Sequence, residues 1–453
     1  YGDERDRERG AFVRLEATSG EERGRPDFLR WRERLWKANA RRWTPARAVL
    51  RDSSSWGGLV WAEADCAGLI RHRPRESWAW VASLKTGPEP GQTPALLAAP
   101  ALGGVASLCL PGLPHVLAAL TASSCPEALR DLRLAGLAKR EASAFLRSGI
   151  AFRLRSLFVE GPVPAAAWEA LARLPGLQNL GVPSPDPTFF RSAACRLKSL
   201  SADASWPGRP FAAMTRSDCA AGLRQLFLHG KGACPSLPSA RFWPTLEHLS
   251  FRDRRCDPVA LATVPAAPRL RVLDLYWTGL DAAGLRLLAS SPLCAALDCL
   301  RLGGSVLGPD GARALAAMPA APLALDLAGA HLGDDGVSIL AAWPGLARCR
   351  VLTLSYNKIT AAGVAALAKS PHAAGLVGLS LFANPIRDEG LRRLLRAPFL
   401  PRLESLDINS CHLHSSATKM IQAADLPAMR QLSADHEQPH RLRAALPHIP
   451  CVA

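Results

Sequence analysis

The sequence is short of aromatic residues, of methionine and of closely spaced cysteines. Its 453 residues include 3 tyrosines and 4 methionines, and aromatic residues make up only 6%. The 12 cysteines contain no C-x-x-C pair, so the usual zinc-ribbon and thioredoxin-type spacings are excluded. Scattered cysteines, together with the lack of a secretory signal at the start of the sequence, predict reduced structural thiols in a cytoplasmic protein.

Long apolar runs are also missing. Residues 90–126 contain no Asp, Glu, Lys or Arg, but prolines and glycines interrupt them repeatedly. No uninterrupted run reaches the roughly 20 apolar residues that a membrane-spanning helix needs. We therefore expect no membrane segment.

The sequence lacks the motifs of the common enzyme classes. It has no phosphate-binding loop, no nucleophile elbow, no kinase motif set and no spacing that singles out a catalytic triad. Residues 436–440 read H-E-Q-P-H, which matches the zinc-protease string H-E-x-x-H. That motif needs both histidines on one continuous helix, and Pro439 would break such a helix. A zinc hydrolase is therefore only a third hypothesis, and we expect no enzyme, no cofactor and no bound metal.

Basic residues outnumber acidic ones, 55 to 39, which gives a formal net charge of +16. The excess is spread along the chain and is larger in the middle than near the C-terminus. A basic helix is predicted over residues 26–42, with Arg30, Arg34, Lys37 and Arg41 on one face. A spread excess indicates solubility and loose attraction to polyanions more than a dedicated nucleic-acid groove.

What the sequence does contain is a repeat, seen most clearly in residues 349–367. The first half of this segment alternates apolar and polar residues, which predicts a half-buried strand. The second half predicts a short helix over residues 360–369, with Thr360 as its N-cap. A single strand–turn–helix unit cannot bury a core, so such units must stack on copies of themselves.

Aligned copies of this unit recur at intervals of 25 to 27 residues. The last polar position of each predicted strand is occupied in turn by Thr278, Ser305, Ala330, Asn357, Asn384 and Cys411. A glycine follows six residues after each of the first five, at Gly284, Gly311, Gly336, Gly363 and Gly390. A leucine follows four residues later, at Leu288, Leu315, Leu340, Leu367 and Leu394. We expect these glycines to lie where close packing of helix on sheet leaves no room for a side chain.

This pattern, L-x-x-L-x-L-x-x-N-x-L with a helical second half, resembles the leucine-rich repeat of the ribonuclease-inhibitor type. The resemblance implies an α/β solenoid, a curved horseshoe with parallel strands on its concave face and helices and turns on its convex face. It implies no reaction, because the fold hosts many functions.

The N-terminal residues suggest a second resemblance. Residues 1–15 are similar to the end of the repeat-companion domain of bacterial proteins; the matching positions are Gly2, Asp3, Arg9, Gly10, Phe12, Val13, Arg14 and Leu15. We therefore expect a short helical module and array start over residues 1–80, followed by irregular repeats over 81–269 and regular repeats over 270–428. Residues 429–453 would form a C-terminal cap, with an edge strand over residues 429–434.

The C-terminal region also holds a second group of candidate metal ligands, formed by Cys411, His412, His414, His448 and Cys451. In the repeat register, Cys411 points inward while His412 and His414 point outward. These side chains therefore cannot easily share one ion, and we expect structural or incidental roles for them.

The residues between the leucines of the regular strands should project from the concave face. The candidate partner-binding residues there are Asp274, Tyr276, Trp277, Arg301, Asp326, Tyr356, Phe382 and Asp407. Aromatic residues with interspersed charge are typical of interface hot spots, so we expect a monomeric, non-enzymatic scaffold that binds a protein partner. Two alternatives stay open: the acidic and basic residues only pair across neighbouring strands, or the basic segments bind nucleic acid or another polyanion.

Overall fold

The computed structural model describes residues 50–434, except for 57–58, 65–80, 86–91, 100–101, 103–104, 111–113, 123–126, 138–141, 192–193, 204–208, 230–239, 253–260 and 263–266. The chain divides into two compact units. Unit 1 comprises Tyr1–Leu200 with Ser217–Cys219, and unit 2 comprises Ser201–Arg216 with Ala220–Ala453. The predicted N-terminal module before residue 50 and the cap beyond residue 434 lie outside the described residues, as does the H-E-Q-P-H string.

Each repeat contributes one short strand. The strands are β1 (Leu50–Trp56), β2 (Leu59–Ala64), β3 (Val81–Lys85), β4 (Ser107–Leu110), β5 (Asp131–Leu134), β6 (Ser156–Val159), β7 (Asn179–Val182), β8 (Ser199–Asp203), β9 (Gln225–His229), β10 (His248–Arg252), β11 (Val272–Asp274), β12 (Cys299–Arg301), β13 (Ala324–Asp326), β14 (Val351–Thr353), β15 (Gly378–Ser380), β16 (Ser405–Asp407) and β17 (Gln431–Ser433).

Helices follow most of the strands. The α-helices are α5 (Thr93–Leu97), α6 (Pro114–Ala122), α7 (Ala142–Leu146), α8 (Gly149–Arg153), α9 (Trp168–Ala172), α10 (Arg209–Arg216), α12 (Ala282–Ala289), α13 (Gly308–Ala316), α14 (Gly333–Ala342), α15 (Ala361–Lys369), α16 (Arg387–Leu394) and α17 (Ser416–Gln422). Short 3-10 helices lie at Ala165–Ala167, Phe189–Arg191, Trp243–Thr245, Cys294–Ala296, Pro344–Arg348, Pro371–Gly375 and Leu400–Arg402.

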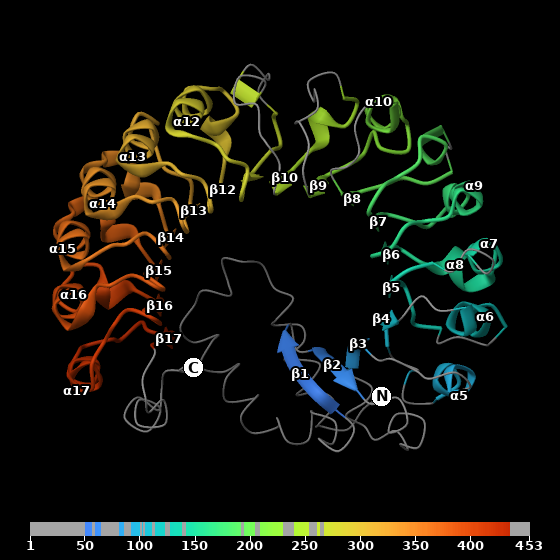
Figure 1. Cartoon of the computed structure of the whole chain (residues 1–453), viewed down its shortest axis with the longest axis horizontal. Coiled ribbons are helices and arrows are strands. Elements are labelled where there is room, and N and C mark those ends of the chain that lie inside the picture. The colour runs from blue at the N-terminus through green and yellow to red at the C-terminus, as the bar shows by residue number, and fades with distance from the viewer. Residues whose placement is uncertain are drawn as a thin grey trace, which may run out of the picture. The chain divides into compact units, whose positions relative to one another are not determined.

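In unit 1, β1 pairs antiparallel with β2, and β2 to β7 form a parallel ladder. One leucine from each of β4 to β7 occupies the same position of this ladder: Leu108, Leu132, Leu157 and Leu180 lie side by side and are buried. Helices α5 to α9 cover the same side of this sheet (Figure 1). The irregular spacing of these repeats leaves room only for helices of five to nine residues.

In unit 2, β9 to β17 are all parallel and in register. The strands line the inner side of this unit, and α12 to α17 lie on the outer side (Figure 1). Buried leucines again run through the ladder, at Leu226, Leu249, Leu273, Leu300, Leu325, Leu352, Leu379, Leu406 and Leu432. The fold is therefore the predicted α/β leucine-rich-repeat solenoid.

The strands of the regular repeats are shorter than the sequence pattern indicates. Each of β11 to β17 has three residues, so that β14 ends at Thr353 and not near Asn357. The chain then turns sharply, because the residue before each aligned polar position has a left-handed backbone, as at Tyr356 with φ 56°. The predicted edge strand near the C-terminus is confirmed as β17.

The turns are held by buried side chains and by bonds between repeats. The Asn357 amide is fully buried and donates hydrogen bonds to the carbonyls of Leu327, Leu354 and Ser355. Its Oδ1 accepts a bond from the backbone N–H of Leu332, one repeat earlier. The Leu327 and Ser355 carbonyls also accept backbone bonds, from Ala330 N and Gly329 N, so the amide adds side-chain bonds to an already hydrogen-bonded turn.

Helix α15 begins where the sequence predicts. The Thr360 hydroxyl accepts a hydrogen bond from Ala362 N, which makes it the N-cap. Asp334 of the preceding repeat adds a second cap, because its Oδ1 accepts bonds from the backbone N–H groups of Thr360 and Gly363. The start of α15 is thus tied to the preceding repeat.

The glycines at the start of these helices lack room for a side chain, but for a different reason from the one we expected. A Cβ on Gly311 would lie 2.4 Å from Cβ of Leu307, and one on Gly390 would lie 2.8 Å from Cβ of Ile386. At Gly311, Gly336 and Gly390 the nearest atoms belong to the apolar residue four positions earlier, and at Gly363 to Asp334 and Ile359, not to the sheet. Glycine there lets that loop side chain pack under the helix start.

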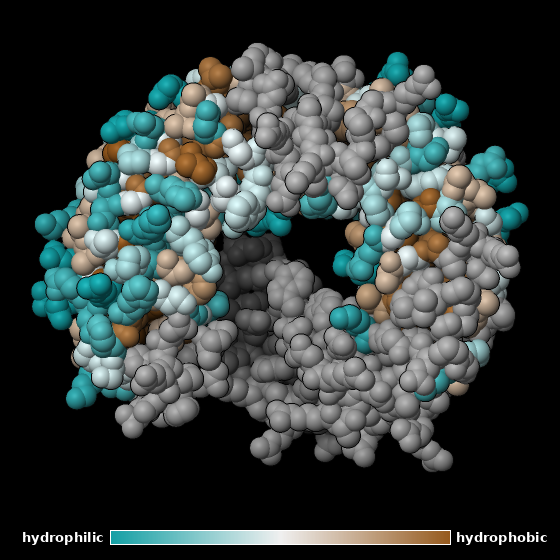
Figure 2. All heavy atoms as spheres, viewed as in Figure 1, coloured by the Kyte–Doolittle hydropathy of each residue, from teal (hydrophilic) through white to brown (hydrophobic). Residues whose placement is uncertain are grey.

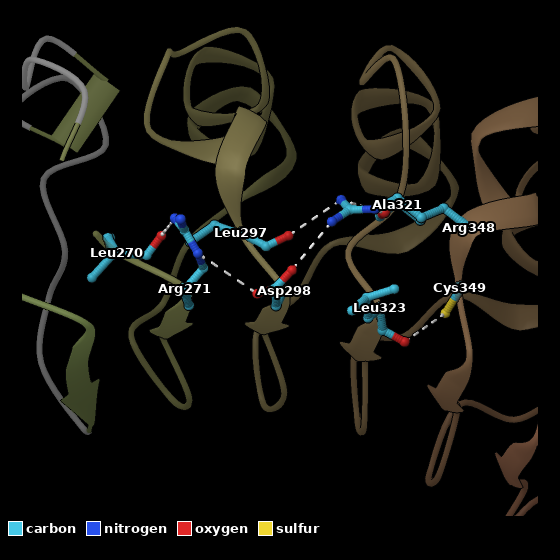
Figure 3. Close-up of polar contacts among 8 residues, drawn as sticks. All are labelled: Leu270, Arg271, Leu297, Asp298, Ala321, Leu323, Arg348 and Cys349. Atoms are coloured by element: carbon cyan, nitrogen blue, oxygen red, sulfur yellow. Dashed lines mark hydrogen bonds and ion pairs between the residues drawn. The ribbon is translucent and has the colours of Figure 1, made fainter. Parts of the chain in front are cut away.

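Polar contacts at the amino ends of the strands also join repeats (Figure 3). The Arg348 guanidinium donates to the carbonyl of Ala321 at 3.2 Å and pairs with Asp298 at 3.2 Å, so it reaches back across two repeats. Figure 2 shows hydrophilic residues spread over the helix-bearing side of unit 2, with hydrophobic residues in smaller groups between them. None of the helices in the described part of the chain is long and apolar enough to cross a bilayer.

Candidate interaction surface

The last residues of strands β11 to β16 lie side by side in the sheet and form what we call the strand row: Asp274, Arg301, Asp326, Thr353, Ser380 and Asp407. Four of the eight candidate residues belong to this row. The order of charges along it is acidic, basic and acidic over the first three strands, followed by two hydroxyl residues and a final carboxylate.

Asp274 is not an exposed contact residue, which corrects the expectation from the sequence. Its side chain is only 1% exposed. Its Oδ2 accepts hydrogen bonds from Arg252 Nε at 3.0 Å and Nη2 at 2.7 Å, and Arg301 Nη1 lies 3.7 Å away. Its Oδ1 accepts a bond from the backbone N–H of Tyr276. A buried carboxylate needs such partners, so Asp274 serves the fold by fixing two arginines and a turn.

Asp326 and Asp407 share this turn role. Each accepts a hydrogen bond from the backbone N–H two residues later, at Ala328 and Asn409 respectively. Burial raises the pKa of the Asp326 carboxyl above its usual value. The alternative that the acidic and basic residues pair across strands holds for Asp274 with Arg301, while no ion pair within the described residues joins Arg301 to Asp326.

A second row lies in the turns that follow the strands. We call it the turn row: Trp277, Gly304, Gly329, Tyr356, Ala383 and Ser410. All six residues have positive φ, between 54° and 71°. Their backbones continue the ladder, since Trp277 N donates to Gly303 O and Tyr356 N donates to Phe382 O. Two of the six positions hold glycine, which this conformation favours, and two more hold the small residues alanine and serine.

Trp277 and Tyr356 are the exceptions in the turn row. Both side chains are 60% exposed, although a bulky residue in a left-handed backbone is strained. The Trp277 ring lies over Gly304, where an added Cβ would be 2.6 Å from its Cδ2 atom. Neither ring is buried in the core, so core packing does not offset the backbone strain at these two residues.

Tyr276 and Phe382 occupy the position before the turn row and are half-buried. The Tyr276 ring covers Gly303, and the Arg252 guanidinium lies 5.8 Å from the centre of that ring. The Phe382 and Tyr356 rings meet edge to face at 5.0 Å. The sequence pattern predicts these four aromatic residues on the strands. In the structure they lie instead in the turns at the carboxyl ends of the strands.

The eight candidates therefore form two groups. Asp274, Tyr276, Trp277, Arg301 and Asp326 come from β11 to β13 and the turns after them. Tyr356, Phe382 and Asp407 come from the next three repeats. Trp277 and Tyr356 are three strand steps apart, or about 15 Å.

Sequence reasoning missed Arg252 and His248, which come from the last irregular repeat. Arg252 binds Asp274 of the next strand, and His248 packs against Phe227 with ring centres 4.7 Å apart. Burial lowers the pKa of His248, and no partner for its buried Nε2 atom is found among the described residues. The strand register could have revealed this contact. His248 pairs with Val272 in the sheet, so Arg252 lies just beyond the end of β11 and within reach of Asp274.

The described ranges contain no cluster of metal ligands. No group of three or more His, Cys, Asp or Glu residues there could hold a metal ion. Cys411 is buried and donates to Leu381 O, whereas His414 is exposed and pairs with Asp388 at 3.5 Å. The other two ligands of the predicted C-terminal group, His448 and Cys451, lie outside the described residues.

Comparison with known proteins supports the repeat. Residues 350–368 match a family model described as a leucine rich repeat. No curated protein matches the chain at a significant level. A solved structure of the yeast Rad7 and Elc1 complex is similar at 13% identity and a TM-score of 0.44, covering 99% of this chain and 92% of the other. A leucine-rich-repeat protein of Leptospira interrogans is similar at 17% identity and a TM-score of 0.36, covering 86% and 94%.

Proposed function

We propose that this chain is a non-enzymatic scaffold that binds a partner protein on the strand-bearing face of unit 2, centred on Trp277 and Tyr356. The observation that carries the proposal is the conformation of these two residues. Each combines a left-handed backbone with a large exposed ring, at a position where the other repeats hold glycine, alanine or serine. Strain at exposed side chains is typical of functional sites.

The surroundings of the two rings suit a protein interface. Tyrosine, tryptophan and arginine are the residues most enriched at hot spots. The Tyr276 ring lies next to Trp277, and the Arg252 guanidinium lies against the Tyr276 ring. The platform is stiff, because every turn is hydrogen-bonded to the next one. A preformed surface lowers the ordering cost of binding. Leucine-rich-repeat folds commonly act as such scaffolds.

The test is a double substitution, Trp277→Ala with Tyr356→Ala, measured against a partner recovered by pull-down from native lysate. We expect the affinity to fall by about 2 kcal/mol or more, as at typical hot spots. Phe152→Ala is the matched control, because Phe152 is 46% exposed and lies in unit 1. Equal affinities of the double variant and the parent would show that the partner binds elsewhere.

The alternative function, binding of nucleic acid or another polyanion, rests on the net charge of +16 and on the basic helix predicted over residues 26–42. That helix lies outside the described residues, so this alternative stays a prediction. Salt separates the two functions. Binding through several phosphates weakens steeply with salt, whereas an interface centred on aromatic rings does not.

A further inference from the structure

Two arginines, on the strands that flank β11, share one buried carboxylate. Arg252 and Arg301 are 44% and 41% exposed at their side chains, while Asp274 between them is 1% exposed. Asp274 Oδ2 lies 2.7 Å from Arg252 Nη2 and 3.7 Å from Arg301 Nη1. Both guanidinium groups are therefore close together, and each keeps part of its surface open to solvent.

The shared carboxylate leaves this arginine pair incompletely paired. Among the described residues, Asp274 is the only carboxylate in ion-pair contact with either arginine, and its other oxygen is already bound to Tyr276 N. Asp326, on the strand after Arg301, interacts with both arginines only at longer range. Arg301 is the less satisfied of the two, because its contact with Asp274 is longer than a hydrogen bond. A partly exposed guanidinium whose N–H groups are not taken up by Asp274 is suited to bind a second carboxylate in a forked arrangement.

The neighbouring residues favour a single carboxylate over a chain of phosphates. Beyond Arg301, the strand row continues with Asp326, Thr353, Ser380 and Asp407, and it contains no other cation. A nucleic acid carries a charge at every nucleotide and gains affinity from each additional cation that it meets. The carboxylates of Asp326 and Asp407 would repel a nucleic acid that ran along the strand row. A single acidic side chain or chain terminus needs only the arginine pair.

An apolar side chain should accompany that carboxylate. The Trp277 ring stands exposed in the turn after β11, one repeat before Arg301 in the same sheet. The ladder bonds from Leu275 N to Arg301 O at 2.8 Å and from Trp277 N to Gly303 O at 2.9 Å set Trp277 beside Gly303, two residues after Arg301. The Arg252 guanidinium lies 5.8 Å from the centre of the Tyr276 ring, and that ring lies 6.2 Å from the Trp277 ring. A carboxylate bound at the arginine pair thus brings a neighbouring residue of the ligand towards the indole.

We infer that the partner presents an acidic segment, in which an Asp, Glu or C-terminal carboxylate binds Arg252 and Arg301 and an adjacent apolar side chain packs on Trp277. This inference rests on the proposed function and names the chemistry of the partner. Asp274 and Tyr276 act as positioning residues, since Asp274 contacts both arginines and the Tyr276 ring lies against Arg252.

The experiment selects random linear peptides displayed on phage against the full chain, with removal of those that also bind the Trp277→Ala, Tyr356→Ala variant. We expect the remaining peptides to share one acidic residue beside an aromatic or aliphatic one. A synthetic peptide of this kind should lose about tenfold in affinity or more with Arg301→Gln, which equals about 1.4 kcal/mol. Replacing its acidic residue by the matching amide should cause a similar loss, and the two losses should not add.

Controls separate charge from fold. Arg301→Lys keeps the charge but lacks the fork, so we expect an intermediate loss. Arg313→Gln removes an exposed arginine from helix α13 and should leave affinity unchanged. Circular dichroism and thermal unfolding of each variant check that the fold is retained.

Each outcome decides one of the two proposals. Selected peptides that are neutral or basic, and that do not respond to Arg301→Gln, would refute the acidic segment but keep the aromatic surface. Peptides that survive the loss of both aromatic residues would overturn the proposed surface as well. Failure to select any peptide, or displacement of the selected peptide by a single-stranded oligonucleotide at moderate salt, would overturn the inference.

Discussion

Asn384 Oδ1 lies 2.9 Å from the backbone nitrogen of Asn357, one repeat earlier, and accepts its hydrogen bond. The same oxygen accepts a bond from Ile359 N at 3.0 Å, and the amide nitrogen of Asn384 donates to the carbonyls of Leu354 and Leu381. Each asparagine therefore closes its own turn and also fixes the turn of the preceding repeat. Because both side chains are fully buried, water cannot replace these bonds.

We expect Asn384→Ala to destabilise the fold strongly. The substitution leaves two buried N–H donors without acceptors, and each unsatisfied group costs about 1–3 kcal/mol. Chemical denaturation measures this loss. Asn409→Ala is the matched control, since the Asn409 side-chain oxygen has no hydrogen-bond partner among the described residues. A similar loss in both variants would mean that the bridge between repeats contributes little.

We also expect Gly363→Ala to lower the melting temperature markedly. The new Cβ would lie 2.5 Å from Asp334 Oδ1 and 2.8 Å from Ile359 Cγ2. It would push away the carboxylate that caps helix α15 and strain the loop before it. Gly222→Ala is the control, because a Cβ there meets nothing within 4 Å. Equal melting temperatures for the parent and Gly363→Ala would contradict the tight register of these glycines.

The register of the repeats, the buried leucines and the Thr360 cap could be predicted from the sequence because they depend on spacing alone. A leucine every repeat must face the core, and a threonine before an alanine-rich segment is an ordinary helix start. The glycine positions were also predicted correctly. The cause of the crowding at these glycines was not predicted, because the spacing does not tell which neighbouring side chain fills the space at Gly311.

The aromatic surface was predicted less well, for a physical reason. Alternation of apolar and polar residues continues through Tyr356, so it predicts a strand up to that residue. The backbone instead leaves the strand after Thr353, and the left-handed turn at Tyr356 has no sequence signal when glycine is absent. Burial of Asp274 was missed because its partner Arg252 comes from an irregular repeat. The domain boundaries at residues 80, 269 and 428 stay predictions.

Core packing yields a third prediction, for Leu354→Ala. Leu354 is fully buried, so its truncation should cost about 2–5 kcal/mol from lost transfer energy and an added cavity. Val351→Ala in the same region is the control, since Val351 is 43% exposed. Because repeats stabilise their neighbours, hydrogen exchange should rise in adjacent repeats too. Exchange that rises in one repeat only would argue against this coupling.

A fourth prediction concerns alkaline pH. Burial raises the pKa of the Cys349 thiol from 9.0 to about 12. Between these values the unfolded chain releases a proton that the folded chain keeps, so the free energy of unfolding falls as pH rises, by at most about 1.4 kcal/mol per pH unit for this group. Below pH 9 the contribution is fully present.

The check compares denaturation of the parent and Cys349→Ala at several pH values above 9. The variant should show a shallower decline in stability with pH, whatever its absolute stability. In the parent, a thiol reagent near neutral pH should label Cys349 only after unfolding, because the thiolate is the reactive form. Parallel declines in both proteins would show that Cys349 ionises normally.

The last prediction tests whether the aromatic turns are strained. At Trp277 the backbone has φ 58°, a conformation that glycine adopts freely and that costs other residues about 1–2 kcal/mol. We therefore expect Trp277→Gly to be more stable than Trp277→Ala by about 1 kcal/mol, and the same order at Tyr356. At Val351, which lies in a strand, the order should reverse, because glycine there loses more entropy on folding than alanine. Thermal and denaturant unfolding of the six variants measure these differences.

If the alanine variants are as stable as the glycine variants at both turns, the backbone is not strained there. Only the exposure of the two rings would then support a binding role for them. The opposite outcome is that the glycine variants are the more stable ones and no longer bind the partner. Trp277 and Tyr356 would then lower the stability of the fold while they provide binding, a trade-off that is expected of residues retained for function.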